Sequence, residues 1–255
     1  MTALDLITAL ALPPQALVNQ RVPKKLLSDN AAATAADKRL IQDSIEDLIW
    51  VAALKPDTIG VTAYRDDDRD YLELAVLTLS LRCAATPRLS ALVHRAIPYP
   101  VLLIITPPGA ATVTLSLAHI RWAQREADRT VLDGDSVQVT VPANAIGAAF
   151  IQAMALPHQP RANLYALYQG WIDTASALQA AELTGQFSVS ATPERAAQRR
   201  AALHQCQELK AQITQLRAQA GKEKQLPHQV ALNLQIRAAQ ASLTEQLSLL
   251  AGPQP

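Results

Sequence analysis

The chain has 255 residues, of which 49% are hydrophobic and 18% are charged, and its formal net charge is +1. This composition excludes an intrinsically disordered chain and supplies enough apolar residues for a substantial core. Because the net charge is close to zero, whole-molecule electrostatics do not draw the protein toward nucleic acid or membrane. Any site for a polyanion therefore has to be local.

The N-terminal residues predict a short helix followed by a strand. Residues 2–12 carry apolar side chains at helical spacing and end at Pro13. This stretch contains Asp5 and no basic residue, which argues against a signal peptide, and its apolar run is too short to cross a bilayer. We therefore expect a cytoplasmic protein without a membrane segment. Residues 16–22 alternate like a strand, and Pro23 ends its pairing.

A longer helix is predicted to begin after Thr34, because Asp37 follows it at the spacing of a capping box. The apolar residues of this helix repeat at spacings of three and four, at Leu40, Ile41, Ile45, Leu48 and Ile49. The segment 48–54 either continues the helix or begins a buried strand, and its periodicity does not decide between them.

The middle of the chain is rich in predicted strands. Strand patterns occur at 71–82, 101–106, 112–122 and 136–141, and a helix opened by Thr86 and Pro87 lies between the first two. Connections as short as the one after residue 106 favour hairpins over parallel crossovers. The pattern predicts an α+β fold, with a mixed or antiparallel sheet of about five strands and packed helices.

Helical patterns replace strands from about residue 144. The helix predicted over 161–183 carries an aromatic stripe that we expect to dock on the sheet. From residue 191 to the end there are eight Lys or Arg residues against four Asp or Glu residues. The predicted domains are an α+β body (1–156), a helix and connector (157–190) and a helical hairpin extension (191–255).

The hairpin consists of two amphipathic helices joined by GKEKQLP, in the manner of an antiparallel coiled coil. Each apolar seam is only a few heptads long, so we expect it to dock on a partner, on a second copy of the chain or on its own body. The candidate partner-binding residues are Leu209, Ile213, Leu216, Ile236 and Leu243.

An acidic cluster between residues 66 and 73 is the only candidate for catalytic chemistry. Asp70 and Glu73 have the general arrangement of carboxylates that hold magnesium in nucleases. Such strands also carry a Lys two residues after the Glu, and here that position is Ala75. Interleaved Arg65 and Arg69 favour a solvated turn. The sequence thus favours a protein without catalytic activity and without a metal site.

Other catalytic and cofactor signatures are missing from the sequence. Its histidines are scattered singly, and neither its two cysteines, Cys83 and Cys206, nor its histidines have ligand spacing. The sequence contains no GxSxG motif, P-loop or GxGxxG motif. We expect no cofactor and two reduced thiols.

A basic stretch is the better candidate for binding. Its residues are Arg21, Lys24 and Lys25, followed by Lys38 and Arg39 near the start of the next predicted helix. A helix N-terminus adds partial positive charge, so the two segments would hold phosphate if they converge. The alternative is that these side chains are solvated at the end of a strand.

Five segments together resemble a bacterial family known as domain of unknown function 4391. They are VNQRVPKKLL, DKRLIQDSIEDLIWVAALKPDTIGV, YLELAVLTLSLR, LSALVHRAIPYPVLLII and GKEKQLPHQVALNLQI, in this order and at the family's spacing over about residues 1–250. The hairpin tip departs from the family pattern, because Leu226-Pro227-His228-Gln229 makes it less basic. The resemblance implies an association with Snf2-type helicases and DNA methyltransferases in bacterial antiviral defence or restriction-like gene clusters.

These observations lead to one main hypothesis and two alternatives. The main hypothesis is an accessory or adaptor subunit that docks on a helicase or methyltransferase through its hairpin. The first alternative is a direct nucleic-acid-binding protein or metal-dependent nuclease. The second is a homo-oligomer assembled through the C-terminal helices.

Overall fold

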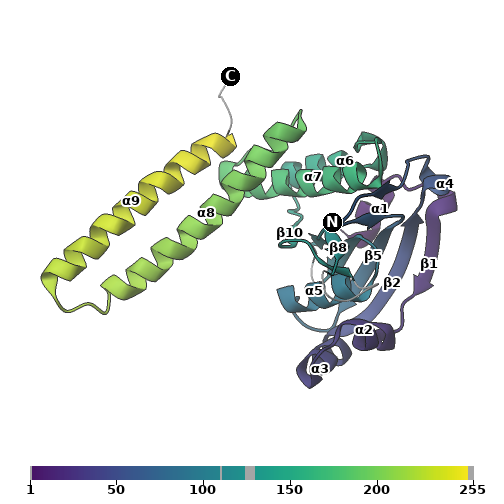
Figure 1. The fold of residues 1–255 in the computed structure, drawn as a ribbon, viewed down its shortest axis with the longest axis horizontal. Coiled ribbons are helices and arrows are strands. Elements are labelled where there is room, and N and C mark those ends of the chain that lie inside the picture. Colours follow the sequence, from purple (N-terminus) through teal and green to yellow (C-terminus); the bar gives the residue numbers. More distant parts are fainter. Residues whose placement is uncertain (1, 110, 124–129, 252–255) are drawn as a thin grey trace. The chain divides into compact units, whose positions relative to one another are not determined.

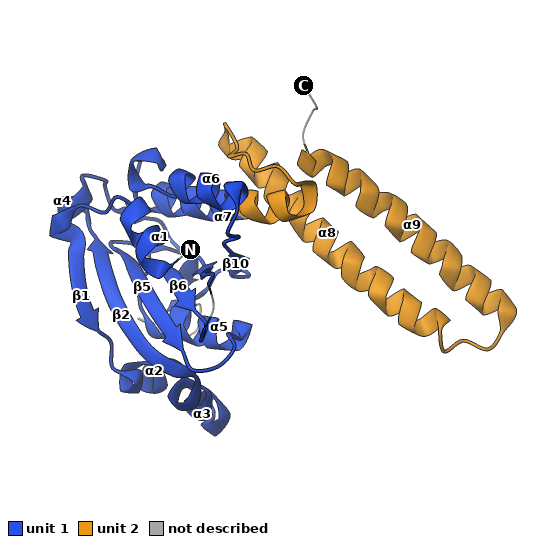
Figure 2. Ribbon diagram, turned by 180° about the vertical axis from the view of Figure 1, so that it is seen from behind, with its two compact units in different colours: residues 1–175 blue, residues 176–255 orange. Residues whose placement is uncertain are grey.

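The computed structural model describes residues 2–109, 111–123 and 130–251. The chain divides into two compact units, residues 1–175 and residues 176–255 (Figure 2). The division falls inside the long helix α7, Leu164–Thr184. Within the described residues, no helix combines the length and the apolar composition needed to cross a bilayer.

Unit 1 is built on a six-stranded mixed sheet with the strand order β1-β2-β5-β6-β7-β10 (Figure 1). This architecture confirms the predicted α+β class and the mixed sheet, with six strands where about five were expected. Two smaller sheets pair β3 with β4 and β8 with β9. The strands are Leu17–Arg21 (β1), Ile45–Leu54 (β2), Tyr64–Arg65 (β3), Asp70–Tyr71 (β4), Leu74–Leu81 (β5), Val101–Thr106 (β6), Thr114–Leu117 (β7), Ile120–Trp122 (β8), Thr130–Leu132 (β9) and Val137–Thr140 (β10).

The sheet is mixed because one of its connections is a helical crossover. Strands β5 and β6 run parallel, with Ala75 opposite Val101, and helix α5 connects them. A parallel pair requires a crossover of this kind, whereas antiparallel neighbours can be joined by a short loop. The other neighbouring pairs are antiparallel, including β6 with β7 across the short connection that predicted a hairpin.

The helices begin where local capping chemistry predicts. The Thr34 hydroxyl accepts a hydrogen bond from the Asp37 amide at 3.1 Å, and the Thr86 hydroxyl accepts one from the Leu89 amide at 3.3 Å. The α-helices are Ala3–Ala9 (α1), Lys24–Ala31 (α2), Ala35–Ser44 (α3), Pro56–Ile59 (α4), Pro87–Ala96 (α5), Ala145–Ala153 (α6), Leu164–Thr184 (α7), Pro193–Ala220 (α8) and Leu226–Ala251 (α9), and the 3₁₀ turns are Pro14–Ala16 (η1) and Leu156–His158 (η2).

The prediction that the helix after Thr34 extends to Ile49 is wrong, because α3 ends at Ser44 and β2 follows directly. The ladder between β2 and β5 is irregular at two points, between Ile45 and Asp47 and between Trp50 and Ala52. Each irregularity offsets the alternation of faces by one residue. The larger buried side chains therefore recur every three residues, at Ile45, Leu48, Val51 and Leu54, and Ala52 is buried as well. This spacing imitates one face of a helix.

Other boundaries also differ from the sequence patterns. The predicted strand 71–82 is divided, since β4 ends at Tyr71 and β5 begins at Leu74. The predicted strand 112–122 is divided into β7 and β8, and β8 pairs with the unpredicted β9. Helix α2 was also not predicted, and Pro23 occupies its N-cap position without a side-chain capping hydrogen bond.

Apolar side chains cover both faces of the central sheet. On one face, alternate residues of β5 and β6, such as Leu77 and Leu103, pack with α2, α3 and α5. The residues between them, such as Val76 and Leu102, are buried on the other face, where α1 contacts β6 and α6. The Tyr168 hydroxyl of α7 donates to the Val101 carbonyl at 2.7 Å, so this part of α7 docks at the start of β6.

Unit 2 contains the predicted helical hairpin, formed by α8 and α9 (Figure 2). The two helices pack against each other through apolar side chains. A second apolar cluster includes Cys206, Leu250 and Ala180, the last from the end of α7. Both cysteines are free thiols. Cys83 in unit 1 is exposed, whereas Cys206 is buried, and this burial raises the pKa of the Cys206 thiol.

Candidate functional site

Lys24, the centre of the predicted basic site, has an internal role. Its ammonium group donates to the Gln42 carbonyl at 3.2 Å and to the Ile45 carbonyl. These carbonyls lie at the C-terminal end of α3, where a cation is favoured. Burial lowers the pKa of Lys24, and the positive charges of Arg82 and Arg21 lower it further. Lys24 thus fastens the start of α2 to the end of α3.

Arg21 is also neutralised within the protein. Its Nε atom lies 2.6 Å from the Asp47 carboxylate. A cavity of about 350 Å³ lies beside it, and its lining carries carboxylates as well as cations, namely Arg21, Val22, Pro23, Lys24, Glu46, Asp47 and Leu48. An anion entering this cavity would meet both signs of charge, so the cavity is a poor phosphate site.

The basic residues were predicted to converge at the N-terminus of α3, but Lys24 does not lie there. Lys24 contacts the opposite end of this ten-residue helix, about 13 Å from its start. The first turn of α3 instead contains Asp37. Its carboxylate accepts two hydrogen bonds from the Arg88 guanidinium, at 2.9 Å from Nε and at 2.8 Å from a terminal nitrogen. This hydrogen bonding to Arg88 is the main cause that lowers the pKa of Asp37.

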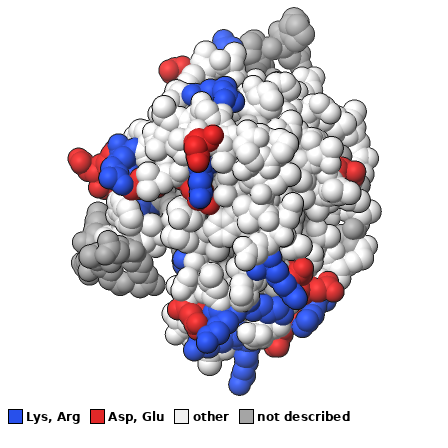
Figure 3. Space-filling view, turned by 90° about the vertical axis from the view of Figure 1, so that its right-hand side faces the viewer, with Lys and Arg blue, Asp and Glu red and all other residues white. Residues whose placement is uncertain are grey.

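Three of the predicted basic residues remain available to solvent. Lys25 on α2 and Lys38 and Arg39 on α3 are exposed, and none forms an ion pair with the described residues. Lys and Arg side chains gather at the lower end of the face in Figure 3, with acidic side chains beside them. Only these three, rather than all five predicted residues, could contact a phosphate backbone without breaking an internal bond.

The two candidate catalytic carboxylates each have a cation of their own. Asp70 Oδ2 lies 2.5 Å from an Arg65 terminal nitrogen, and Glu73 Oε2 lies 3.3 Å from Lys55 Nζ. Lys55 follows the end of β2, so the fold supplies a lysine next to Glu73 that its own strand lacks. However, no three His, Cys, Asp or Glu side chains in the described part of the chain are grouped so that they could hold a metal ion.

An aromatic and polar cluster that the sequence did not reveal lies within unit 1. The Tyr71 hydroxyl is 2.5 Å from His119 Nδ1, and His119 Nε2 is 2.9 Å from the Gln169 amide oxygen. The Tyr165 ring stacks with the rings of both Tyr64 and His119. Burial raises the pKa of Tyr71 and keeps its phenol protonated. The cluster joins segments distant in sequence, so no local pattern could have identified it.

The predicted partner-binding residues form the contact inside the hairpin. Four of them lie within one buried cluster between α8 and α9 and the fifth packs partly against it, these being Leu209, Ile213, Leu216, Ile236 and Leu243. The four buried side chains are at most 9% exposed. Another molecule could reach them only if the two helices separated. A docking surface on the closed hairpin therefore has to use other side chains.

A row of exposed apolar side chains provides such a surface. Leu226, Val230 and Leu234 follow one another at a spacing of four on α9, with exposed fractions of 70%, 51% and 60%. Residues at this spacing lie on one side of a helix. We refer to these three residues as the α9 stripe. It faces away from the seam that Ile236 and Ala239 bury against α8.

A groove of about 610 Å³ lies at the closed end of the hairpin, and its α9 residues lie on a different side of that helix from the α9 stripe. It is lined by Gln219, Lys222, Glu223, His228, Ala231, Leu232 and Gln235. The Glu223 carboxylate accepts the Gln225 amide at 2.8 Å, and this hydrogen bond is the main cause that lowers the pKa of Glu223. Lys222, Lys224 and Arg237 are exposed near the stripe. The surface is therefore apolar along its centre and mostly basic at its edges.

Comparison with known proteins identifies one family. The family model described as "Domain of unknown function (DUF4391)" matches residues 10–243, and this range includes the sheet of unit 1, the α9 stripe and most of the hairpin. Neither the curated proteins nor the solved structures contain a match.

Proposed function

The chain belongs to this family of unknown function, and from that premise we propose that it is a non-catalytic adaptor of a bacterial DNA-processing or defence system. In this role the hairpin docks on a larger partner, a Snf2-type helicase or a DNA methyltransferase. The association with these enzymes comes from the sequence resemblance. The observation that carries the adaptor role is the α9 stripe.

The α9 stripe is suited to binding one face of another helix. Its three large apolar side chains are each at least half exposed, and the opposite side of the helix packs against α8. Covering them would contribute roughly 1–2 kcal/mol each. Apolar residues at this spacing, laid against an apolar groove or helix face, are a recurrent mode of peptide recognition.

The charges beside the stripe indicate the chemistry of its partner. Lys222, Lys224 and Arg237 are exposed there, against the single carboxylate of Glu223, which is partly held by its own turn. A complementary partner would present an amphipathic helix with an apolar face and acidic flanks. We assign this helix to the helicase or methyltransferase.

The test is co-purification from the native host with the full-length protein. The variant Leu226→Ser/Val230→Ser/Leu234→Ser removes the apolar stripe, and Gln205→Ser/Gln212→Ser/Gln215→Ser places the same residue at three exposed positions of α8. We expect mass spectrometry to identify a helicase or DNA methyltransferase with the parent protein and the control, and a loss of at least tenfold with the stripe variant.

Two results would overturn this proposal. One is equal recovery of the enzyme with the stripe variant and the control. The other is a native mass of two or more copies for the isolated protein that falls to one copy in the stripe variant, because the stripe would then serve self-assembly.

Direct nucleic-acid binding is the second candidate, and the exposed cations of α2 and α3 favour it. The appropriate variant is Lys25→Ala/Lys38→Ala/Arg39→Ala, because these residues hold no internal bond whereas Lys24 does. If these cations contact phosphates, the variant should bind with a weaker salt dependence. The magnitude of the slope of log affinity against log salt concentration should fall by about 2–3. An unchanged affinity and slope for a duplex or single strand would exclude this site.

A further inference from the structure

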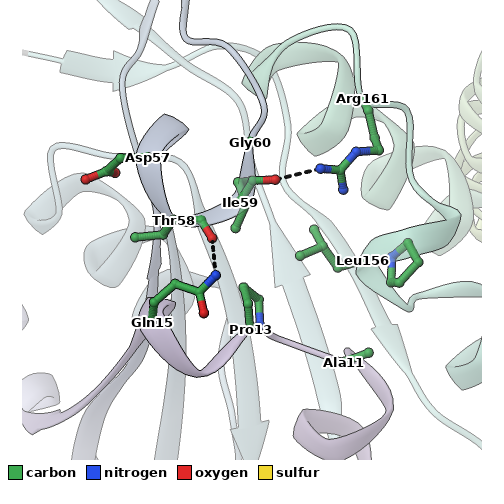
Figure 4. Close-up of a pocket in the computed structure, with 10 residues that line it drawn as sticks. Ala11, Pro13, Gln15, Asp57, Thr58, Ile59, Gly60, Leu156 and Arg161 are labelled. Atoms are coloured by element: carbon green, nitrogen blue, oxygen red, sulfur yellow. Dashed lines mark hydrogen bonds between the residues drawn. The ribbon is translucent and has the colours of Figure 1, made fainter.

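A cavity of about 380 Å³ lies in unit 1, and its lining includes none of the five predicted basic-site residues. Three separate segments form its walls: the connection after α1, the short helix α4 and the connection before α7 (Figure 4). Its size is in the range of sites for small molecules. The lining residues are Ala11, Pro13, Gln15, Asp57, Thr58, Ile59, Gly60, Leu156, Pro157 and Arg161.

Arg161 supplies an ordered positive charge at this cavity. One terminal nitrogen donates to the Ile59 carbonyl at 2.6 Å, which fixes the guanidinium beside the end of α4. Arg161 forms no ion pair with the described residues, so its remaining N–H groups have no carboxylate partner there. Figure 4 shows the Asp57 side chain pointing away from the other labelled side chains, so Asp57 does not neutralise it.

The remaining walls combine apolar surface with one amide. Pro13, Ile59, Leu156 and Pro157 give the cavity its apolar part. The Gln15 side chain donates through Nε2 to the Thr58 carbonyl at 2.9 Å, which fixes its orientation and leaves its oxygen as an acceptor. A planar guanidinium matches a carboxylate with two parallel hydrogen bonds. A site that combines apolar side chains with one such group suits a ligand that has an apolar body and one anionic end.

We infer that this cavity binds a small organic carboxylate, with the carboxylate on Arg161 and the apolar body against Leu156 and the neighbouring prolines. No residue of the α9 stripe lines this cavity, so the inference does not depend on the proposed docking surface. A charge-assisted bidentate contact of this kind contributes enough that its loss should weaken binding by at least about tenfold.

The experiment uses the full chain and two simple probes, benzoate and hexanoate, with benzamide and hexanamide as their uncharged counterparts. Titrations are followed by the backbone amide signals of Ile59 and Gly60. We expect saturable shifts with the carboxylates and binding at least tenfold weaker with the amides and with inorganic phosphate. Equal binding of an amide or of phosphate, or the absence of a saturable shift, would overturn the inference.

Variants separate ligand binding from the structural bond of Arg161. Arg161→Gln should lose at least tenfold in affinity, and Arg161→Lys, which keeps the charge without the planar fork, should be intermediate. Pro157→Glu retains the Arg161 hydrogen bond and places a competing carboxylate at the exposed rim, so it should lose affinity as well. Arg95→Gln, an exposed arginine on α5, is the control with unchanged affinity. Wild-type affinity in both Arg161→Gln and Pro157→Glu would refute the site.

Discussion

The buried histidine of α5 should make the stability of unit 1 depend on pH. His94 is 1% exposed, and its Nε2 lies 2.9 Å from the Ser116 hydroxyl on β7. Its Nδ1 is buried without a hydrogen-bond partner in the described structure. Protonation would place a charge in the core with no group to receive the new N–H. Burial accordingly lowers the pKa of His94 to about 4.

The direction of the effect follows from comparing the two states. An unfolded chain has a histidine pKa of about 6.5, so between pH 6.5 and pH 4 the unfolded state binds a proton that the native state does not. The free energy of unfolding therefore falls as the pH falls through this window, and His94 causes no further loss below about pH 4. A difference of about 2.5 pKa units corresponds to about 3 kcal/mol. That is a large part of the stability of a typical domain.

The perturbation is His94→Gln, which keeps a hydrogen-bonding group for Ser116 and does not titrate. Urea unfolding is followed by tryptophan fluorescence, because all three tryptophans, Trp50, Trp122 and Trp171, lie in unit 1. The parent should be the more stable protein at pH 7.5, and its advantage should shrink by about 3 kcal/mol at pH 4. A second variant, His94→Leu/Ser116→Ala, removes both polar groups and should show the same reduced dependence on pH.

The reasoning fails if the parent and both variants lose the same stability between pH 7.5 and pH 4. His94 would then titrate equally in the native and unfolded states, and its burial would not control its protonation. Equal urea dependence of unfolding at each pH is needed for this comparison, since a changed slope indicates a different unfolded ensemble.

Three further predictions test the packing within each of the two units. Asp37→Asn removes the carboxylate held by Arg88 and should lower the urea midpoint at pH 7. Because the pKa of Asp37 is lowered in the native state, this deficit should begin to shrink as the pH falls below about 4 and should vanish only below the lowered native pKa; a deficit that does not shrink at all as the pH falls below about 4 would contradict the ion pair. Gly147→Ala would place a Cβ 1.8 Å from a backbone carbonyl oxygen and should cost about 1–3 kcal/mol, seen as a lower melting temperature; an unchanged melt would show that the contact relaxes. Ile213→Ala in the hairpin seam should lower the free energy of unfolding of unit 2, followed by circular dichroism, by about 2 kcal/mol or more. Leu234→Ala on the α9 stripe should change this free energy by at most about 0.5 kcal/mol. Equal effects of the two substitutions would mean that the seam is misassigned.

The sequence predicted the elements whose signals are local. Thr34 and Thr86 marked the starts of α3 and α5, because a cap depends only on residues three positions away. The α+β class and the C-terminal hairpin followed in the same way from periodicity within each segment. The sequence also contained the residues of the α9 stripe, but it could not separate them from the seam, because both are apolar positions on the same helix.

Contacts between distant segments decided the chemistry of the individual residues. Lys24 and Lys25 are neighbours of the same type, yet only Lys24 reaches the carbonyls at the end of α3. Lys55 meets Glu73 because β2 and β5 are paired in a particular register. The irregularities of that same ladder produced the helix-like spacing in β2. Arg161 likewise becomes a candidate anion-binding residue only because its segment lies beside α4 in the folded chain.

By itself, the sequence of this protein determined its α+β class, the starts of α3 and α5, the C-terminal helical hairpin and the family to which the chain belongs. The tertiary structure alone decided which charges are neutralised, which apolar side chains remain in water and where a cavity forms. The physical reason is range: caps and periodicity arise from interactions within a few residues, whereas ion pairs, strand register and cavities arise between segments that only the folded chain brings together.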